Sequence, residues 1–342
     1  MEKGLNIAVV GATGAVGREF IQIVEQRRFP AARIRLFSSS RSAGTYLQVN
    51  GENIRVEETS PGCFDGIDLS FNSVDTNLTK ALTPMAVEAG ALVIDDSSAF
   101  RIDLNVPLVV PEINGRDVEW HKGIISIPNC ATTPVVMALS PLHQVNPILR
   151  VVVVTFQSAS GAGTGVATDL KEQTEAILAG REVPTGSQPQ QMAFNLFPHI
   201  GSFLGTGYTE EEQKISEETK KILHNPDIAV SATCVRCPIY VGHSAAVNIE
   251  FQNPISPEVV RELLEATAGV KVLDDTQKHL YPTPLIAAGT DDVYVGRIRK
   301  DESHANGLVM WTVADNLRKG AALNAIQIAE EVLRRDCLKP GK

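Results

Sequence analysis

The stretch LNIAVVGATGAVGREFIQIVEQRR, residues 5–28, decides the fold of the first part of the chain. Residues 5–10 are an apolar run typical of a buried strand, and residues 18–27 have the pattern of an amphipathic helix. Glycines between a strand and a helix allow a pyrophosphate to approach free N–H groups at the helix N-terminus. We therefore predict a dinucleotide site, the alternative being a tight turn that simply requires glycine. The expected contact residues are Gly11, Thr13, Gly14, Ala15 and Val16.

Further apolar runs follow this first unit and indicate a parallel sheet. They cover residues 33–39, 67–74, 91–98, 107–113 and 123–129, and a helical pattern covers 76–89. Strands that alternate with helices are typical of a parallel sheet with helices on both faces. The sequence thus predicts an α/β, Rossmann-like first domain.

The pattern changes after residue 130, where strands outnumber helices. Strand-like runs occupy 150–165, which ends in a glycine-rich loop, and 228–237, 244–251 and 291–315. Helices are expected at 166–179, 257–268 and 317–335, and the Pro- and Gln-rich segment 181–191 is typical of a surface loop. This composition predicts an α+β second domain.

The end of the second predicted strand bears on which dinucleotide is bound. An NAD site usually has an acid there for the ribose hydroxyls. No acid occurs from Leu36 to Gly44, and the segment instead offers Ser38, Arg41 and Ser42. Hydroxyls with an arginine suit a 2′-phosphate, so we predict NADP. A polar loop that happens to contain one arginine is the alternative.

Composition and charge exclude several classes of protein. The 342 residues are 43% hydrophobic and 21% charged, which is ordinary for a globular protein. The net charge of −9 argues against non-specific binding to nucleic acid or to an anionic membrane. No apolar run approaches the ~20 residues of a membrane span, and no signal-peptide layout is present. The five scattered cysteines do not indicate disulfides, so we expect a cytoplasmic protein.

Cys130 lies where a predicted strand ends and a predicted helix begins, in IISIPNCATTPVVMALSPL, residues 124–142. Pro134 fits the first turn of a helix. A helix N-terminus depresses the pKa of a thiol, and the resulting thiolate attacks acyl carbons. We therefore predict that Cys130 is a nucleophile. The alternative is a small buried hydrophobic residue, which is the usual role of cysteine.

Four motifs give the chain a resemblance to a known family. GATGAVG (11–17), PNCATT (128–133), SASGAG (158–163) and RCPIYVGHS (236–244) occur in this order. Together they resemble the compact bacterial type of aspartate-β-semialdehyde dehydrogenase, and the resemblance runs from about residue 5 to 335. Ala131 departs from the family, which often has Ser or Thr beside the cysteine. The segment 71–80 also lacks the glycine-rich turn common in relatives, which leaves the cofactor contacts at 72–77 open.

The resemblance implies a reaction and a domain organisation. The reaction is the NADPH-dependent reductive dephosphorylation of L-aspartyl-4-phosphate to L-aspartate-4-semialdehyde through a cysteine thioester. It serves the biosynthesis of lysine through diaminopimelate, and of methionine, threonine and isoleucine. The implied domains are a dinucleotide-binding domain at 1–129, onto which a C-terminal helix at 316–337 packs back, and a catalytic and dimerisation domain at 130–315. A homodimer is implied as well.

The resemblance also assigns the catalytic and substrate-binding residues. His243 is the expected acid–base residue, and a pKa near neutrality would suit that task. Arg236 lies in a strand that is otherwise poor in charge, and bidentate contact with a carboxylate suits arginine. Gln157 is expected to orient the substrate, and Glu211 to meet its amino group. From the residues alone, a solvated helix start is the simpler interpretation of Glu211.

The remaining assignments concern phosphate and the cofactor. The family match places phosphate at Arg101 and Lys214, with Asn129 as a further contact. It places Ser160, Gly161 and Asn316 near the cofactor. We expect no metal, because the CVRC segment at 234–237 has no second pair with metal spacing.

Two other functions remain open at this point. One is another acyl-phosphate or aldehyde dehydrogenase on the same scaffold, such as one acting on N-acetylglutamyl phosphate. The other is a catalytically inactive relative that binds nucleotide and acts by interaction. The presence of both the cysteine and the histidine argues against the inactive relative.

Overall fold

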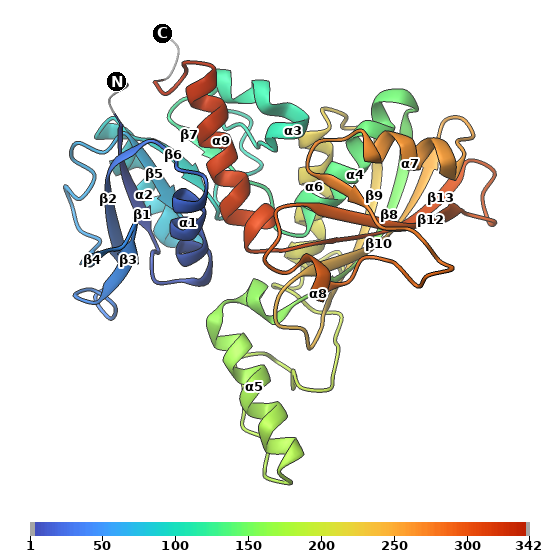
Figure 1. The fold of residues 1–342 in the computed structure, drawn as a ribbon, viewed down its shortest axis with the longest axis horizontal. Coiled ribbons are helices and arrows are strands. Elements are labelled where there is room, and N and C mark those ends of the chain that lie inside the picture. The colour runs from blue at the N-terminus through green and yellow to red at the C-terminus, as the bar shows by residue number, and fades with distance from the viewer. Residues whose placement is uncertain (1–3, 340–342) are drawn as a thin grey trace. The chain divides into compact units, whose positions relative to one another are not determined.

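The structure is a computed structural model that describes residues 4–339 (Figure 1). The chain forms two compact units. The first comprises the described residues up to Asn129 together with those from Ala321 onward, and the second runs from Cys130 to Gly320.

The first unit is built on a seven-stranded sheet with the strand order β3-β4-β2-β1-β5-β6-β7. All neighbours are parallel except β3 and β4, which form an antiparallel pair. The predicted parallel sheet is therefore confirmed. The strands are β1 Leu5–Val10, β2 Ala31–Ser38, β3 Tyr46–Val49, β4 Glu52–Glu58, β5 Leu69–Asn72, β6 Leu92–Asp95 and β7 Ile124–Ser126.

Helices cover both faces of this sheet because alternate residues of β1 point in opposite directions. Ile7 and Val9 belong to an apolar cluster shared with α1 and α9, whereas Ala8 and Val10 belong to a second cluster shared with α2. Helix α9 contacts α1 and β6 within this unit (Figure 1), so the C-terminal helix returns to the first unit as expected. The helices are α1 Ala15–Gln26, α2 Thr76–Glu88, α3 Pro111–Asn114, the 3-10 helix Gly115–Trp120 and α9 Leu323–Arg334.

Two expectations for the first unit differ from the structure. The run 107–113 is not a strand, since it makes one isolated bridge, from Leu108 to Ser126, and then enters α3. Pro107 lacks an N–H for a sheet ladder, and Pro111 has the fixed φ that suits a first helical position. Helix α1 begins at Ala15, three residues before the predicted start.

The second unit is built on a six-stranded mixed sheet with the order β11-β12-β13-β10-β8-β9. Strands β8, β10, β13 and β12 are antiparallel neighbours, while β9 pairs parallel with β8 and β11 with β12. This architecture confirms the predicted α+β unit. The strands are β8 Ile148–Gln157, β9 Ala229–Arg236, β10 His243–Phe251, β11 Val270–Val272, β12 Val293–Lys300 and β13 Gly307–Ala314.

One face of this sheet packs against helices, and the other is only half-covered. Helix α4 contacts β12, β13, α6 and α7. Along β8 the residues Val151 and Val153 are buried, whereas Val152 and Val154 on the opposite face are only partly so. The helices are α4 Thr132–Val145, the 3-10 helix Ala159–Ala162, α5 Thr164–Leu178, α6 Glu210–Ile222, α7 Pro257–Glu265 and α8 Pro284–Ala287.

The segment between α5 and α6 has no helix or strand, which confirms the predicted loop. Gln173 of α5 holds it, because the Oε1 atom accepts hydrogen bonds from the backbone N–H groups of Met192 (2.9 Å) and Ala193 (3.2 Å). The helix predicted at 317–335 starts instead as a π-helical turn at Arg318–Ala322. Within residues 4–339 no helix has both the length and the apolar character needed to cross a membrane.

Candidate active site

The glycine loop of the first unit has a backbone that only glycine allows. Gly11 has a φ of 85°, and a Cβ atom placed on it would lie 2.1 Å from the carbonyl oxygen of Ser73. A Cβ atom on Gly17 would lie 2.3 Å from the carbonyl oxygen of Gly11. The loop therefore folds tightly against the segment that follows β5, although this segment lacks glycine.

The start of α1 offers uncapped N–H groups to an anion. Gly14 is the N-cap, no side chain caps the helix, and the first turn contains no acid. The first N–H groups of a helix have no intrahelical acceptor, and the helix dipole favours negative charge there. The loop and the helix start therefore fit a dinucleotide pyrophosphate.

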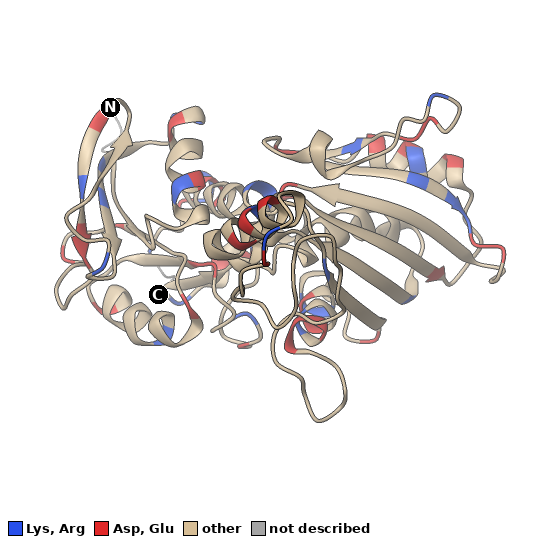
Figure 2. Ribbon diagram, turned by 90° about the horizontal axis from the view of Figure 1, so that it is seen from below, with Lys and Arg blue, Asp and Glu red and all other residues tan. Residues whose placement is uncertain are grey.

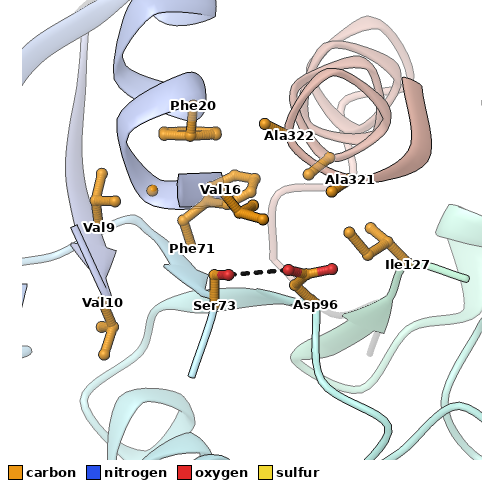
Figure 3. A pocket seen from close by; sticks show the side chains of 12 residues that line it. Val9, Val10, Val16, Phe20, Phe71, Ser73, Asp96, Ile127, Ala321 and Ala322 are labelled. Carbon is orange, nitrogen blue, oxygen red and sulfur yellow. Dashed lines mark hydrogen bonds between the residues drawn. The ribbon is translucent and has the colours of Figure 1, made fainter. Parts of the chain in front are cut away.

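A cavity of about 10 Å³ lies beside this loop, between α1, α9 and the strands (Figure 3). Its lining is mainly apolar and includes Val16, Phe20 and Phe71. At one side Ser73 Oγ donates a hydrogen bond to Asp96 at 2.9 Å. A cavity of this volume holds about one water molecule. It is too small for a dinucleotide, which would have to bind outside it.

The end of β2 contains the residues that the sequence analysis predicted to bind the 2′-phosphate. Ser38 is buried, and its hydroxyl donates to the carbonyl oxygen of Ser39 at 3.2 Å. Arg41 is exposed in the following turn, which is closed by a hydrogen bond from Ser42 N–H to Ser39. An exposed arginine beside this turn fits a 2′-phosphate.

Two neighbouring carboxyl groups at the end of β6 have raised pKa values, which the sequence interpretation missed. Burial raises the pKa of Asp95 from 3.8 to about 7 and that of Asp96 to about 6. Hydrogen bonds from Ser97, and to a smaller extent the positive charge of Arg101, oppose the shift of Asp95, while Arg101 opposes that of Asp96. The Nη2 atom of Arg101 donates to the backbone oxygen of Asp96 at 2.7 Å. The signal in the sequence was the pair of acids at the end of an apolar strand.

Cys130 lies directly before α4, whose N-cap is Ala131. The helix start that the sequence predicted is therefore confirmed, with Pro134 in its first turn. Ala131 is buried and supplies no side-chain cap. A Cβ atom placed on Gly320 would lie 3.0 Å from Cys130 Cβ, so the chain passes close behind the cysteine. Cys130 thus lies at a helix N-terminus, the position from which the sequence analysis predicted a nucleophile.

His243 is buried at the first residue of β10, and the turn after β8 holds its ring. The N–H group of Ser158 donates to His243 Nδ1 at 3.1 Å, and the Ser158 hydroxyl lies 3.1 Å from the same atom. Because a backbone N–H can only donate, the neutral ring carries its proton on Nε2. Among the described residues Nε2 has no hydrogen-bond partner.

The pKa of His243 differs from the value near neutrality that we expected. Burial, and in addition the positive charge of Arg236, lower the pKa from 6.5 to about 3. A backbone hydrogen bond with Gly242 opposes this shift only in small part, so the ring is neutral at physiological pH.

Arg236 ends β9 with its guanidinium buried at 3% exposure. Its Nη1 atom donates to the backbone oxygen of Ser158 at 2.7 Å, while Nε has no partner among the described residues. Burial lowers the pKa of Arg236, and electrostatic interaction with Glu211 and, to a smaller extent, with Cys130 opposes this shift. The guanidinium thus retains one unsatisfied donor in a site that interacts electrostatically with the cysteine.

Gly161 lies close to the side chains of both His243 and Arg236. A Cβ atom placed on it would lie 2.8 Å from both Nε2 and Cε1 of His243 and 3.4 Å from Nη1 of Arg236. The sequence interpretation placed Gly161 near the cofactor, and the structure places its Cα against the imidazole. Open space on this side of the ring therefore depends on glycine.

Asn316, Ser160 and Gln157 complete the polar network of the second unit. Asn316 Oδ1 accepts from the N–H of Gly242 at 2.9 Å and from Ser160 Oγ at 3.2 Å. Gln157 is buried at the end of β8, where its Nε2 atom donates to Thr155 Oγ1 at 3.2 Å. The side chains of Ser160 and Asn316 thus hold the turn beside His243.

Glu211 is buried, which argues against the interpretation as a solvated helix start. It lies at the second position of α6, is 8% exposed, and places Oε2 3.6 Å from Nζ of Lys214. The neighbouring Glu212 instead forms a capping box with Thr209. Glu211 is therefore a buried acidic residue that is not used in the helix cap. Its electrostatic interaction with Arg236 raises the pKa of that arginine.

The cysteines of the CVRC segment contrast with Cys130. Burial raises the pKa of Cys234 to about 12, and it also raises the pKa of Cys237. Both thiols are thus protonated at neutral pH. Within residues 4–339 no cluster of His, Cys, Asp and Glu is arranged to hold a metal ion.

The predicted site residues are divided between the two units. The second unit gathers Cys130, Gln157, Ser160, Gly161, Glu211, Lys214, Arg236, His243 and Asn316, and the first contains the glycine-loop residues with Ser38, Arg41, Ser42, Arg101 and Asn129. Ser158 and Gly320 were missed, since neither residue type carries a chemical signal by itself.

Comparison with known protein families divides the chain at a similar place. Residues 6–121 match the NAD binding domain of semialdehyde dehydrogenase, and residues 139–319 match its dimerisation domain. The fold and the paired matches define a semialdehyde dehydrogenase.

Individual relatives narrow this class. The aspartate-semialdehyde dehydrogenase of Aquifex aeolicus is 48% identical over 335 residues, covering 97% of this chain and 98% of the relative. The crystal structure of aspartate semialdehyde dehydrogenase II from Vibrio cholerae, complexed with ASA, has a TM-score of 0.95 and 40% identity, covering 97% of this chain and 99% of that one. The enzyme of Candida albicans, solved with NADP, has a TM-score of 0.76 and 26% identity over 98% of this chain and 99% of that one. The chain belongs to the aspartate-semialdehyde dehydrogenase family.

Proposed function

We propose that this protein reduces L-aspartyl-4-phosphate to L-aspartate-4-semialdehyde, and catalyses the reverse oxidation in the presence of phosphate. The observation that carries the proposal is the buried group of His243 and Arg236 around Gly161, in electrostatic contact with a cysteine at a helix N-terminus. The family relationship supports the choice of substrate. The product would serve the synthesis of lysine, methionine, threonine and isoleucine.

Cys130 is the proposed nucleophile. In the oxidative direction its thiolate adds to the aldehyde carbon and forms a thiohemiacetal. When the nicotinamide cofactor is bound, it accepts the hydride from this carbon. His243 is the proposed acid–base residue for the hydroxyl proton of this intermediate, and loss of hydride and proton leaves a thioester on Cys130, which phosphate then cleaves. Gln157 orients the carbonyl group.

Arg236 is the proposed clamp for the α-carboxylate, and Glu211 the partner of the amino group. The Nε atom of Arg236, which has no partner among the described residues, supports this role. A carboxylate bound there would offset the positive charge that lowers the pKa of His243. Substrate binding would thus make His243 a stronger base when one is required.

Phosphate requires cations, and we propose Arg101 and Lys214 for it, with Asn129 as a further donor. Arg101 is buried at 6% exposure, and its Nη2 atom donates to the backbone oxygen of Asp96 at 2.7 Å, so its guanidinium is held in a fixed position. Lys214 is half-buried beside Glu211, so its charge is available at the surface of the second unit.

We propose that NADP is the cofactor, and that one unit binds it while the other carries the catalytic residues. The first unit binds the dinucleotide, with its pyrophosphate on residues 11–16 and its 2′-phosphate at Arg41, near Ser38 and Ser42. The second unit carries the chemistry. The uncapped start of α1 and the exposed arginine without a neighbouring acid support this choice.

We propose that the protein is a cytoplasmic homodimer assembled through the second unit. Phe156 and Trp311 lie on the half-covered face of its sheet with ring centroids 5.4 Å apart. Figure 2 shows little charge along the strands of this sheet except near their ends. A half-exposed apolar face with its charged residues near the strand ends suits burial against a second copy.

One assay tests the proposed substrate. The purified protein is given NADP and phosphate with either aspartate semialdehyde or N-acetylglutamate semialdehyde, and NADPH formation is followed. We expect turnover of the aspartate compound alone, dependent on phosphate. Preferential turnover of the acetylated compound would overturn the proposal, because it would assign the chain to the other acyl-phosphate reductase.

A further inference from the structure

Asp96 presents a carboxyl group to the cavity beside the glycine loop (Figure 3). It directly follows β6, and its backbone N–H donates to the oxygen of Asn72 at 2.8 Å. The residue is half-buried, and it lines the same cavity of about 10 Å³ as Val16 and Gly17 from the start of α1. Because a cavity of this volume holds about one water molecule, the carboxyl group lies close to this helix start.

Ser73 links this carboxyl group to the backbone of the glycine loop. Ser73 Oγ donates to Asp96 Oδ2 at 2.9 Å, and a Cβ atom placed on Gly11 would lie 2.1 Å from the carbonyl oxygen of Ser73. Ser73 and Asp96 therefore stand together beside the folded loop. An anion bound to the N–H groups of the loop and of the helix start would come close to a side chain that is itself negative when ionised.

The surroundings of Asp96 favour its neutral form. Burial raises its pKa from 3.8 to about 6, while the positive charge of Arg101 and the hydrogen bond from Ser73 oppose this shift. The neighbouring titratable group is Asp95, whose own pKa the charge of Asp96 helps to raise. Among the residues that line the cavity, those of α1 and α9 do not titrate. Arg18, exposed on α1, donates to the loop and keeps its charge throughout this pH range.

We propose that Asp96 is a cofactor-binding residue that meets the pyrophosphate in its protonated form, so that cofactor binding takes up a proton from solvent at this carboxyl group. This inference rests on the proposed cofactor. Ser73 Oγ engages Oδ2, so a proton on Oδ1 can be donated to a phosphate oxygen. The bound anion in turn raises the pKa of Asp96, because a nearby negative charge disfavours a carboxylate. No covalent bond of the cofactor forms or breaks.

NADPH should bind more weakly as the pH rises. Below about pH 6 the carboxyl group is already protonated in the cofactor-free protein, and NADPH meets no negative charge there. As the pH rises through this value, the cofactor-free protein loses the proton and has to regain it on binding, so the affinity falls. We expect Kd for NADPH to increase at least roughly fivefold between pH 6 and pH 8.5, with uptake of about half a proton or more per NADPH near pH 6.5.

Calorimetric titration of the purified protein with NADPH measures both quantities. The binding enthalpies in two buffers of different ionisation enthalpy give the number of protons taken up. NADPH is the probe because its nicotinamide ring is uncharged. Asp96→Asn is the test variant, since its amide can accept from Ser73 and donate to phosphate but cannot titrate. Asp95→Asn is the matched control, because this neighbouring side chain lies on the opposite face of β6, with Val93 in the cluster shared with α2.

The differences between the proteins isolate Asp96, because the 2′-phosphate of NADPH, which also titrates near pH 6, contributes equally to all of them. We expect the wild type and Asp95→Asn to take up about half a proton more than Asp96→Asn near pH 6.5. At pH 8.5 Asp96→Asn should bind NADPH roughly fivefold more tightly than the wild type. Equal proton uptake by the wild type and Asp96→Asn overturns the inference and leaves the proposed function intact, as does weaker binding by Asp96→Asn that circular dichroism shows to be folded.

A second variant covers the case in which Asp96→Asn does not fold. Ser73→Ala removes a hydrogen bond that lowers the pKa of Asp96, so the pH of maximal proton uptake should move upward. A maximum at the wild-type pH would show that another group takes up the proton, which overturns the inference. If the wild type does not bind NADPH at all, the proposed cofactor fails and the inference fails with it.

Discussion

Gly161 leaves no room for a side chain beside His243, since a Cβ atom at residue 161 would lie 2.8 Å from Nε2. Real Cβ atoms essentially never come so close, and the ring is buried, so the imidazole would have to shift. The reactive face of the histidine is therefore kept open by the absence of a side chain on a neighbouring turn.

A Gly161→Ala variant should lose activity without losing its fold. A shift of the ring by a few tenths of an ångström to 1 Å is expected to lower kcat by roughly 10²-fold. Steady-state kinetics and circular dichroism measure the two effects. Gly165→Ala is the matched control, because a Cβ atom there meets nothing within 4 Å and the residue lies inside α5. Equal activity of the two variants would contradict the prediction.

A Cys130→Ala variant should lose phosphate-dependent NADPH formation by about 10⁴-fold or more. NADP binding, measured by calorimetry, should be retained because the glycine loop belongs to the first unit. Cys337→Ala serves as control, since that thiol is also partly exposed and hydrogen-bonds within the first unit. Wild-type activity of Cys130→Ala would exclude a thioester on this residue.

An Arg41→Ala variant should raise KM for NADP by roughly 10- to 100-fold, the worth of a charge-assisted hydrogen bond. KM for NAD should stay unchanged, because NAD has no 2′-phosphate. Arg33→Ala, an exposed arginine near the other end of β2, should affect neither cofactor. If Arg41→Ala changes both KM values equally, the basis for NADP selectivity lies elsewhere.

An Asp95→Asn variant should stabilise the protein most at high pH. The folded state raises the pKa of Asp95 from 3.8 to about 7, so stability present below pH 3.8 is lost as the pH rises through about 7. This pKa difference corresponds to at most roughly 4 kcal/mol. Asparagine keeps the contacts with the N–H and hydroxyl of Ser97.

Thermal unfolding at pH 5 and pH 8 measures this effect. We expect the gain in Tm from Asp95→Asn to be larger at pH 8 by on the order of 5 °C. Asp65→Asn, at an exposed carboxylate of the same unit, should show no such difference. A gain that is the same at both pH values would mean that Asp95 is ionised in the fold.

The fold could be predicted where periodicity and capping agree. Strand β1 has the predicted bounds, and α2 begins after Asp75, whose side chain caps the helix. The hairpin of β3 and β4 was missed because its residues are largely polar, although its signal was present. Asn50 and Gly51, with φ of 49° and 81°, form the two-residue turn that favours a hairpin.

Only the chemically distinctive residues of the candidate site could be predicted from the sequence. Cys130, Arg236 and His243 stand out because their side chains carry charge, nucleophilicity or a proton. The sequence could not indicate that Gly161 lies against His243, because 82 positions separate them and their contact depends on strand pairing. It also could not indicate the lowered pKa of His243, since burial is a property of the folded unit.

The hydrogen bonds of the Asn316 side chain determine when the turn beside His243 can form during synthesis of the chain. Its Oδ1 atom accepts hydrogen bonds from Ser158 Oγ at 3.1 Å and from the N–H of Gly242 at 2.9 Å, thereby joining the ends of three strands. These partners are 158 and 74 positions away along the chain. Until Asn316 has left the ribosome, these hydrogen bonds cannot form, and the turn beside His243 is incomplete. The turn beside His243 is therefore completed only late in translation, long after Cys130 has been synthesised.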